Sequence, residues 1–109
     1  MTGQPDDEAA PTVDGASAAG TISCDIPIVN KRGLHARASA KFVQMVERFE
    51  ADVSVTRNGE TVGGNSIMGL MMLSAGIGTT ITVSATGPEA KAAVAAIAEL
   101  IGNRFNEDE

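Results

Sequence analysis

The chain has 109 residues and a formal net charge of −6, and this length accommodates one compact domain. Half of its 14 acidic residues lie in the first 19 and the last three positions, and the segment between them carries seven acids against all eight Lys and Arg residues. This nearly neutral body excludes the basic surface of a nucleic-acid-binding protein, and three phenylalanines without Trp or Tyr exclude a base-stacking platform.

The residues able to bind metals or form disulfides are few. Cys24 is the only cysteine and His35 the only histidine, so the chain has no internal disulfide and lacks the ligand set of a usual zinc site. The N-terminal sequence MTGQPDDEAA has neither the basic region nor the apolar core of a secretion signal, and no apolar run is long enough to span a membrane. We therefore expect a cytoplasmic protein without cofactor, metal or insertion into a membrane.

The first segment of the chain differs in composition from the rest. Residues 1–19 are rich in Ala, Gly, Pro, Ser, Thr and acids, and such a segment buries too little apolar surface to fold. It is predicted to form a disordered acidic extension. The domain itself is expected over residues 20–104, followed by an acidic C-terminal tail at 105–109.

The first two elements of the domain follow from hydrophobic periodicity. Apolar and polar residues alternate from Thr21 to Val29, which predicts a strand with one buried face. Pro27 favours the sheet edge, where a missing N–H is tolerated. A period of three to four residues then predicts an amphipathic helix from about His35 to Arg48. Its apolar stripe consists of Ala38, Phe42, Met45, Val46 and Phe49.

A hairpin and a second helix come next. Val53 and Val55 alternate with polar residues, and Asn58-Gly59 is typical of a two-residue hairpin turn, because both residues tolerate a positive φ. The returning strand begins at Thr61 to Gly63. A short, very apolar helix is predicted from Ser66 to Ser74.

The last elements are a strand from Thr79 to Ala85 and a final helix. This helix is expected to begin with Thr86 or Gly87 as N-cap and Pro88 in its first turn. Each strand has one apolar and one small polar face, so the sheet is covered on one side only. The order strand, helix, strand, strand, helix, strand, helix therefore predicts a two-layer α+β sandwich with three helices on one face of the sheet.

The first candidate site is the segment Gly-Leu-His-Ala-Arg-Ala-Ser-Ala from Gly33 to Ala40. His35 stands where a loop becomes a helix, and the unpaired N–H groups of a helix N-terminus favour an anion. There an imidazole can attack a phosphoryl group, and the guanidinium of Arg37 can bind the phosphoryl oxygens. A lone histidine near a helix start is more often a solvated or capping residue, and position alone leaves both interpretations open.

The second candidate site runs from Asn65 to Leu73. Ser66 is placed to be the N-cap of the short helix, which is a purely structural role, and a phosphate on Ser66 would lie at the same helix end. Three methionines exceed what one buried stripe requires. Exposed methionines would form an adaptable surface for several partners, and burial in the core is the alternative. These methionines are Met68, Met71 and Met72.

Together the two stretches resemble the HPr family, the phosphocarriers of the phosphoenolpyruvate-dependent phosphotransferase system. Gly33-Leu34-His35-Ala36-Arg37, followed by small residues and an apolar helix, looks like the HPr active-site signature. Ser66, followed by Ile67, Met68, Leu70 and Leu73, resembles the HPr regulatory-serine signature. The spacing of the two motifs and the element order agree as well, and the resemblance covers roughly residues 20–104.

The resemblance implies an open-faced β-sandwich, with four antiparallel strands in the order 1-4-2-3. It implies that His35 accepts a phosphoryl group on Nδ1 from phosphorylated enzyme I and donates it to an enzyme IIA-type acceptor, while Arg37 steadies the group. Ser66 would be the target of an HPr kinase/phosphorylase. The protein would be a phosphoryl-transfer intermediate rather than a self-sufficient enzyme. The implied docking surface for these partners consists of Ala36, Ser39, Ala40, Met68, Leu70 and Met71.

Three features depart from the family pattern. Ala38 stands where many HPr proteins have Pro, from which we expect altered local rigidity without loss of function, and Asn65 stands where Lys often precedes the regulatory Ser. The acidic extension before residue 20 has no counterpart in the shorter members. The stretch GLHARASAKF is similar to HPr-like proteins of regulatory, nitrogen-related branches in proteobacteria. Regulatory output rather than sugar transport is therefore expected.

Two other functions are alternatives. A regulatory protein that works by docking alone, switched by phosphorylation of Ser66, is expected to lack an active-site histidine, so His35 argues against it. A small ferredoxin-like module that binds a ligand or a metal is expected to have two helices and, for metal transport, paired cysteines. The third predicted helix and the single Cys24 argue against that module.

Overall fold

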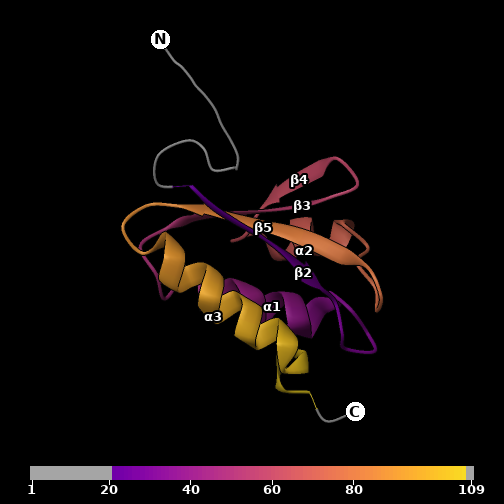
Figure 1. Cartoon of the computed structure of the whole chain (residues 1–109). Coiled ribbons are helices and arrows are strands. Elements are labelled where there is room, and N and C mark those ends of the chain that lie inside the picture. The colour runs from indigo at the N-terminus through magenta and orange to yellow at the C-terminus, as the bar shows by residue number, and fades with distance from the viewer. Residues whose placement is uncertain (1–20, 108–109) are drawn as a thin grey trace.

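The computed structural model describes residues 21–107, and the predicted extension at 1–19 lies outside them. Within this range, three helices cover one face of a four-stranded sheet (Figure 1). Each of the predicted strands and helices is present. In chain order the elements are β2 (Ile22–Pro27), α1 (Ala36–Val46), β3 (Asp52–Arg57), β4 (Glu60–Gly63), α2 (Ile67–Met72), β5 (Thr80–Thr86), α3 (Ala90–Gly102) and the short turn η1 (Arg104–Asn106).

The sheet is antiparallel throughout, in the order β2-β5-β3-β4, which confirms the predicted topology 1-4-2-3. Strand β2 forms one edge, as Pro27 indicated. The register places Val83 of β5 opposite Cys24 on one side and Val55 on the other. The hairpin between β3 and β4 turns at Asn58-Gly59, both with positive φ, as predicted.

The two faces of the sheet have different chemistry. The face toward the helices buries the alternating apolar residues of the strands, including Ile26, Val55 and Ile81. On the other face, hydroxyl groups pair across the strands: the Oγ atoms of Ser23 and Ser84 lie 2.9 Å apart. This uncovered face is polar, as expected for a sheet that packs on one side only.

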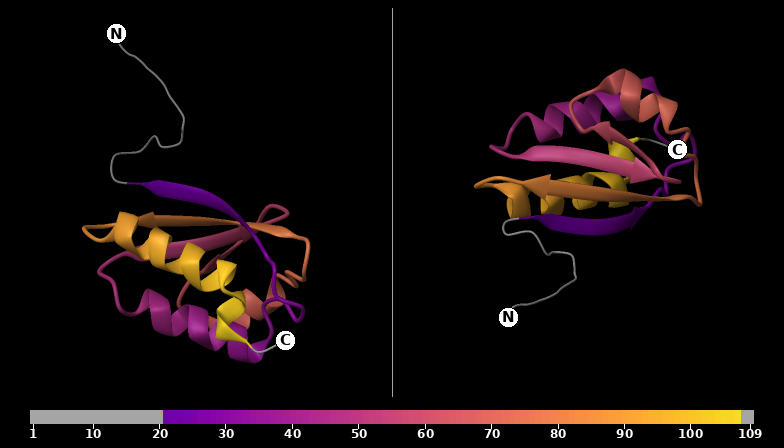
Figure 2. Two further views of the ribbon diagram at one scale, coloured as in Figure 1. Left: turned by 60° about the horizontal axis from the view of Figure 1, so that its bottom comes forward. Right: turned by 90° about the horizontal axis from the view of Figure 1, so that it is seen from above.

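The core lies between the sheet and the helices. Helices α1 and α3 run beside each other over the sheet, and α2 lies next to α1 near β4 (Figure 2). Each helix and η1 contribute large, fully buried side chains to this core: Phe42 from α1, Leu70 from α2, Ile97 from α3 and Phe105 from η1. No helix within residues 21–107 is long and apolar enough to cross a membrane.

Helix α3 begins later than the sequence predicted. Its N-cap is Glu89 rather than Thr86 or Gly87, and the helix starts at Ala90. The loop after α1 explains the difference, because it binds Glu89 from outside the helix. The Glu89 N–H donates to the carbonyl of Glu50 at 3.1 Å, and Glu89 Oε1 accepts the Glu50 N–H at 2.7 Å.

The packed chain also extends past the domain boundary expected at residue 104. Phe105 is fully buried, and Glu107 contacts side chains near the start of α1. The expected boundary coincides with the end of the resemblance, and the residues after it are mostly acidic. The apolar ring of Phe105, which the core accommodates, explains why the chain turns back onto the domain before those acids.

Candidate functional site

A tight loop fixes the position of His35. Gly33 has a φ of +63°, and a side chain there would place its Cβ 2.3 Å from the carbonyl oxygen of Ala75. The next residue, Leu34, donates its N–H to the same carbonyl at 3.0 Å. The loop is thereby held against the segment that follows α2, and only glycine allows so close an approach.

His35 is the N-cap of α1, but its side chain makes no capping hydrogen bond. Its carbonyl accepts the first helical bond, from Ser39 N–H at 2.8 Å. The N–H groups of Ala36, Arg37 and Ala38 come before this bond and have no partner within the helix. His35 therefore caps the helix by its backbone position alone. The interpretation that its side chain acts as a cap is wrong.

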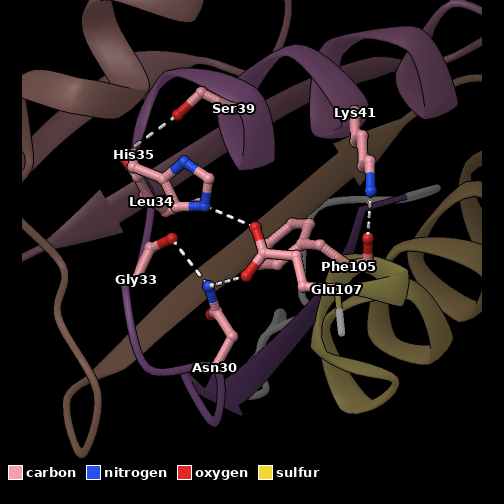
Figure 3. A network of polar contacts seen from close by, with 8 residues as sticks. All are labelled: Asn30, Gly33, Leu34, His35, Ser39, Lys41, Phe105 and Glu107. Atoms are coloured by element: carbon pink, nitrogen blue, oxygen red, sulfur yellow. Dashed lines mark hydrogen bonds and ion pairs between the residues drawn. The ribbon is translucent and has the colours of Figure 1, made fainter. Parts of the chain in front are cut away.

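The His35 ring instead contacts the end of the chain. Its Nε2 atom lies at hydrogen-bond distance from Oε2 of Glu107, and both side chains are mostly buried. Asn30 supports the carboxylate, because its Nδ2 donates to Glu107 Oε1 at 3.3 Å and to the Gly33 carbonyl at 2.9 Å (Figure 3). Neither Glu107 nor Asn30 was a candidate site residue from the sequence.

A left-handed turn brings Glu107 to this place. Arg104, Phe105 and Asn106 have φ values of 56°, 56° and 59°. Left-handed backbone is disfavoured for residues with a Cβ, by roughly 1–2 kcal/mol each. Burial of the Phe105 ring opposes this cost, and so does Lys41, whose Nζ donates to the Phe105 carbonyl at 2.5 Å (Figure 3).

Arg37 lies in the first turn of α1, on the exposed surface. Within the described residues its side chain makes no hydrogen bond or ion pair. Arg37 and His35 are therefore close in sequence, but their side chains do not interact. Lys31 and Arg32, in the loop before Gly33, are exposed as well. The guanidinium of Arg37 is thus available to a group that arrives from solvent.

Ser66 has the capping role predicted for it. It is the N-cap of α2, and its Oγ accepts the Gly69 N–H at 2.9 Å. The side chain is half-buried beside Gly69, where an added Cβ would lie 3.0 Å from Ser66 Oγ. The hydroxyl is therefore part of the local structure of α2.

Part of the docking surface implied by the resemblance is exposed, and part is buried. Met68 is 73% and Met71 42% exposed, and Ala36 is exposed at the start of α1. Leu70 and Ser39 are fully buried, and Ser39 Oγ donates to the Leu34 carbonyl at 3.2 Å (Figure 3). These two residues support the surface from below and do not form it. We call the exposed apolar side of α2 the methionine patch; it consists of Ile67, Met68, Met71 and Met72.

Comparison with known families identifies the chain. The family model described as "PTS HPr component phosphorylation site" matches residues 22–103, which include both His35 and Ser66. The chain belongs to the HPr family of phosphocarrier proteins. The phosphocarrier protein HPr of Cupriavidus necator is 52% identical over 85 residues, which cover 78% of this chain and 96% of that protein.

Other members agree in sequence and in structure. The phosphocarrier protein HPr of Pseudomonas aeruginosa is 50% identical over 86 residues, covering 78% of this chain and 96% of the relative. The phosphocarrier protein NPr of Shewanella violacea is 38% identical over 82 residues, covering 75% and 90%. The crystal structure of an HPr from Thermoanaerobacter tengcongensis superposes with a TM-score of 0.77 at 36% identity, covering 81% of this chain and 99% of the other. The HPr fold is thus shared.

Proposed function

We propose that His35 carries the phosphoryl group of this phosphocarrier, accepting it from phosphorylated enzyme I and donating it to an enzyme IIA-type acceptor. The observation that supports this role is the placement of the ring at the start of α1 without a capping bond. His35 directly precedes three helical residues whose N–H groups lack partners within the helix. A helix N-terminus of this kind favours an incoming anion.

The transfer requires an unprotonated ring nitrogen. In the proposed step the lone pair of His35 Nδ1 forms a bond to phosphorus, while the bond from phosphorus to the histidine nitrogen of enzyme I breaks and leaves its electron pair on that nitrogen. The first-turn N–H groups and the Arg37 guanidinium would bind the phosphoryl oxygens. The product is a phosphohistidine, from which the acceptor takes the group by the reverse chemistry.

The docking surface proposed for enzyme I and for the acceptor joins the start of α1 to the methionine patch. Ala36 and Ala40 lie on α1, which packs beside α2, and Met68 and Met71 are exposed on α2. Flexible, apolar methionines adapt to differently shaped partners, which suits a carrier that binds a donor and an acceptor in turn.

Ser66 is proposed as a regulatory phosphorylation site for an HPr kinase/phosphorylase. Modification would release the Ser66 hydroxyl from the Gly69 N–H and would add a charge of about −1.5 to −2 next to the methionine patch. Because charge beside an apolar contact is unfavourable for association, phosphorylation of Ser66 is expected to weaken docking to enzyme I.

The downstream branch is proposed to be regulatory rather than sugar transport, on the similarity of GLHARASAKF to HPr-like proteins of nitrogen-related branches. Transfer rates to IIA-type domains of the two branches test this proposal. Faster transfer to a regulatory domain is the expected result, and a preference for a sugar-specific domain would contradict it.

The central test is intact mass after incubation with phosphoenolpyruvate and enzyme I, repeated after mild acid. The expected result is a gain of one phosphate that acid removes, as for a phosphohistidine. A mass that stays unchanged with an active, cognate enzyme I would contradict the proposal. It would favour the docking-only regulator, and Ser66 would then be the residue to test.

A further inference from the structure

We propose that Glu107 is a positioning residue for His35: its carboxylate accepts the Nε2–H of the imidazole and thereby presents Nδ1 as the nucleophile. The proposal rests on the function proposed above. It adds to the site of His35 a residue, Glu107, from the other end of the domain in sequence.

The contact determines which ring nitrogen carries the proton. A carboxylate is an acceptor only, so the hydrogen bond between Glu107 Oε2 and His35 Nε2 requires a proton on Nε2. A neutral imidazole has one such proton, and Nδ1 is left with its lone pair. Nδ1 lies on the side of the ring away from Glu107 (Figure 3).

The carboxylate is itself held in place. Its second oxygen, Oε1, accepts a hydrogen bond from Nδ2 of Asn30, which is fully buried and also donates to the Gly33 carbonyl. Asn30 therefore ties Glu107 to the loop that precedes His35. Ring, carboxylate and loop form one connected network, and the rotation of the imidazole is restricted as in triads that orient a catalytic histidine.

The backbone around Glu107 supports a specific placement. The three residues before it adopt consecutive left-handed conformations, and the Phe105 ring and the Lys41 bond hold this turn against the domain. A C-terminal segment with no structural role would not be expected to adopt three disfavoured left-handed residues in succession. The turn ends where the Glu107 side chain meets His35.

The same carboxylate assists the proposed transfer without exchanging a proton. When the Nδ1–P bond forms, the bond between phosphorus and the histidine of the phosphorylated partner breaks, and its electron pair returns to that nitrogen. The ring of His35 then acquires positive charge, which the adjacent carboxylate stabilises while the proton stays on Nε2. Before the reaction, the hydrogen bond increases the electron density on Nδ1, as carboxylates do for metal-binding histidines.

The kinetic test compares Glu107→Ala, Glu107→Gln and Glu47→Ala, with the last as the control. Glu47 is an exposed acid at the other end of α1, so its removal changes the net charge equally and leaves His35 untouched. We expect Glu107→Ala to lower the maximal rate of phosphoryl acceptance from enzyme I about tenfold. The KM for enzyme I is expected to stay unchanged, because the Glu107 side chain is only 12% exposed. Glu107→Gln, which keeps an acceptor oxygen, is expected to recover part of the rate.

A spectroscopic test does not depend on transfer. In ¹⁵N-labelled protein, the Nε2–H proton of His35 should be observable and exchange slowly with water, and it should be lost in Glu107→Ala but retained in Glu47→Ala. A wild-type rate in Glu107→Ala, a change in KM alone, or protonation of Nδ1 would each overturn the proposal. Absence of phosphate on the unmodified protein would instead overturn the proposed function.

Discussion

Two residues in this protein occupy the same structural position and use it differently. His35 and Ser66 are the N-caps of neighbouring helices, α1 and α2. The Ser66 side chain accepts a hydrogen bond from its own helix, whereas the His35 ring turns away from α1 to Glu107. The comparison separates a side chain that completes local structure from one that is left available for chemistry.

The largest expected difference follows from removing the ring. His35→Ala is expected to abolish phosphoryl acceptance from phosphoenolpyruvate and enzyme I, because no other histidine is present. The free energy of unfolding should fall by only about 1–3 kcal/mol, since the ring makes no capping bond and the mostly buried Glu107 carboxylate keeps its hydrogen bond from Asn30. Intact mass and thermal unfolding measure the two quantities. Undiminished phosphate on the variant would contradict the assignment.

The second prediction concerns the loop that places His35. Gly33→Ala is expected to lower the free energy of unfolding by about 2–3 kcal/mol, because the new Cβ would meet the Ala75 carbonyl at 2.3 Å at a positive φ. Gly59→Ala is the matched control: Gly59 also has a positive φ, but nothing lies within 4 Å of its added Cβ. Equal losses in the two variants, measured by urea unfolding, would show that the close approach at Gly33 is unimportant.

The third prediction adds charge at Ser66 while keeping its cap. Asp is as good an N-cap as Ser, so Ser66→Asp should retain the fold. Its carboxylate lies beside the methionine patch, and we expect phosphorylation by enzyme I at limiting concentration to slow by about tenfold, or about 1.4 kcal/mol. Asn is the uncharged control, because it also caps well. Identical rates for Ser66→Asp and the unmodified protein would remove the regulatory role.

The smallest effect is expected from Ser66→Ala. Loss of the bond to the Gly69 N–H should destabilise the protein by about 1 kcal/mol, with phosphoryl acceptance unchanged. Chemical denaturation and the rate of phosphate incorporation check the two parts. A strong loss of acceptance would show that Ser66 and His35 do not have the separate roles inferred from their side chains.

The features that could be predicted from the sequence are mainly those that neighbouring residues determine. The Asn58-Gly59 turn, the edge position of Pro27 and the cap at Ser66 each follow from local chemistry, and each is confirmed. The strand order agreed as well, although it came from the resemblance to HPr. The start of α3 was placed too early, because Glu50 binds Glu89 from a distant loop and no local signal shows it.

The candidate site was predicted in part. His35 and its helix were found from a compact motif, but Glu107 was counted among the tail acids because it lies 72 positions away in the sequence. Phe105, an isolated aromatic residue after the helix stop at Gly102, was the available signal that the chain turns back. The burial of Ser39 and Leu70 depends on helix packing, which spacing alone does not determine.

The distance in sequence between His35 and Glu107 also has a consequence for protein synthesis. During translation, β2 and α1 leave the ribosome long before the turn at Arg104–Asn106 exists. A nascent or prematurely ended chain that stops before residue 107 carries the complete signature around His35 but has no carboxylate to orient the ring. The histidine motif is made early, and the geometry around it is completed by the last residue that the structure describes.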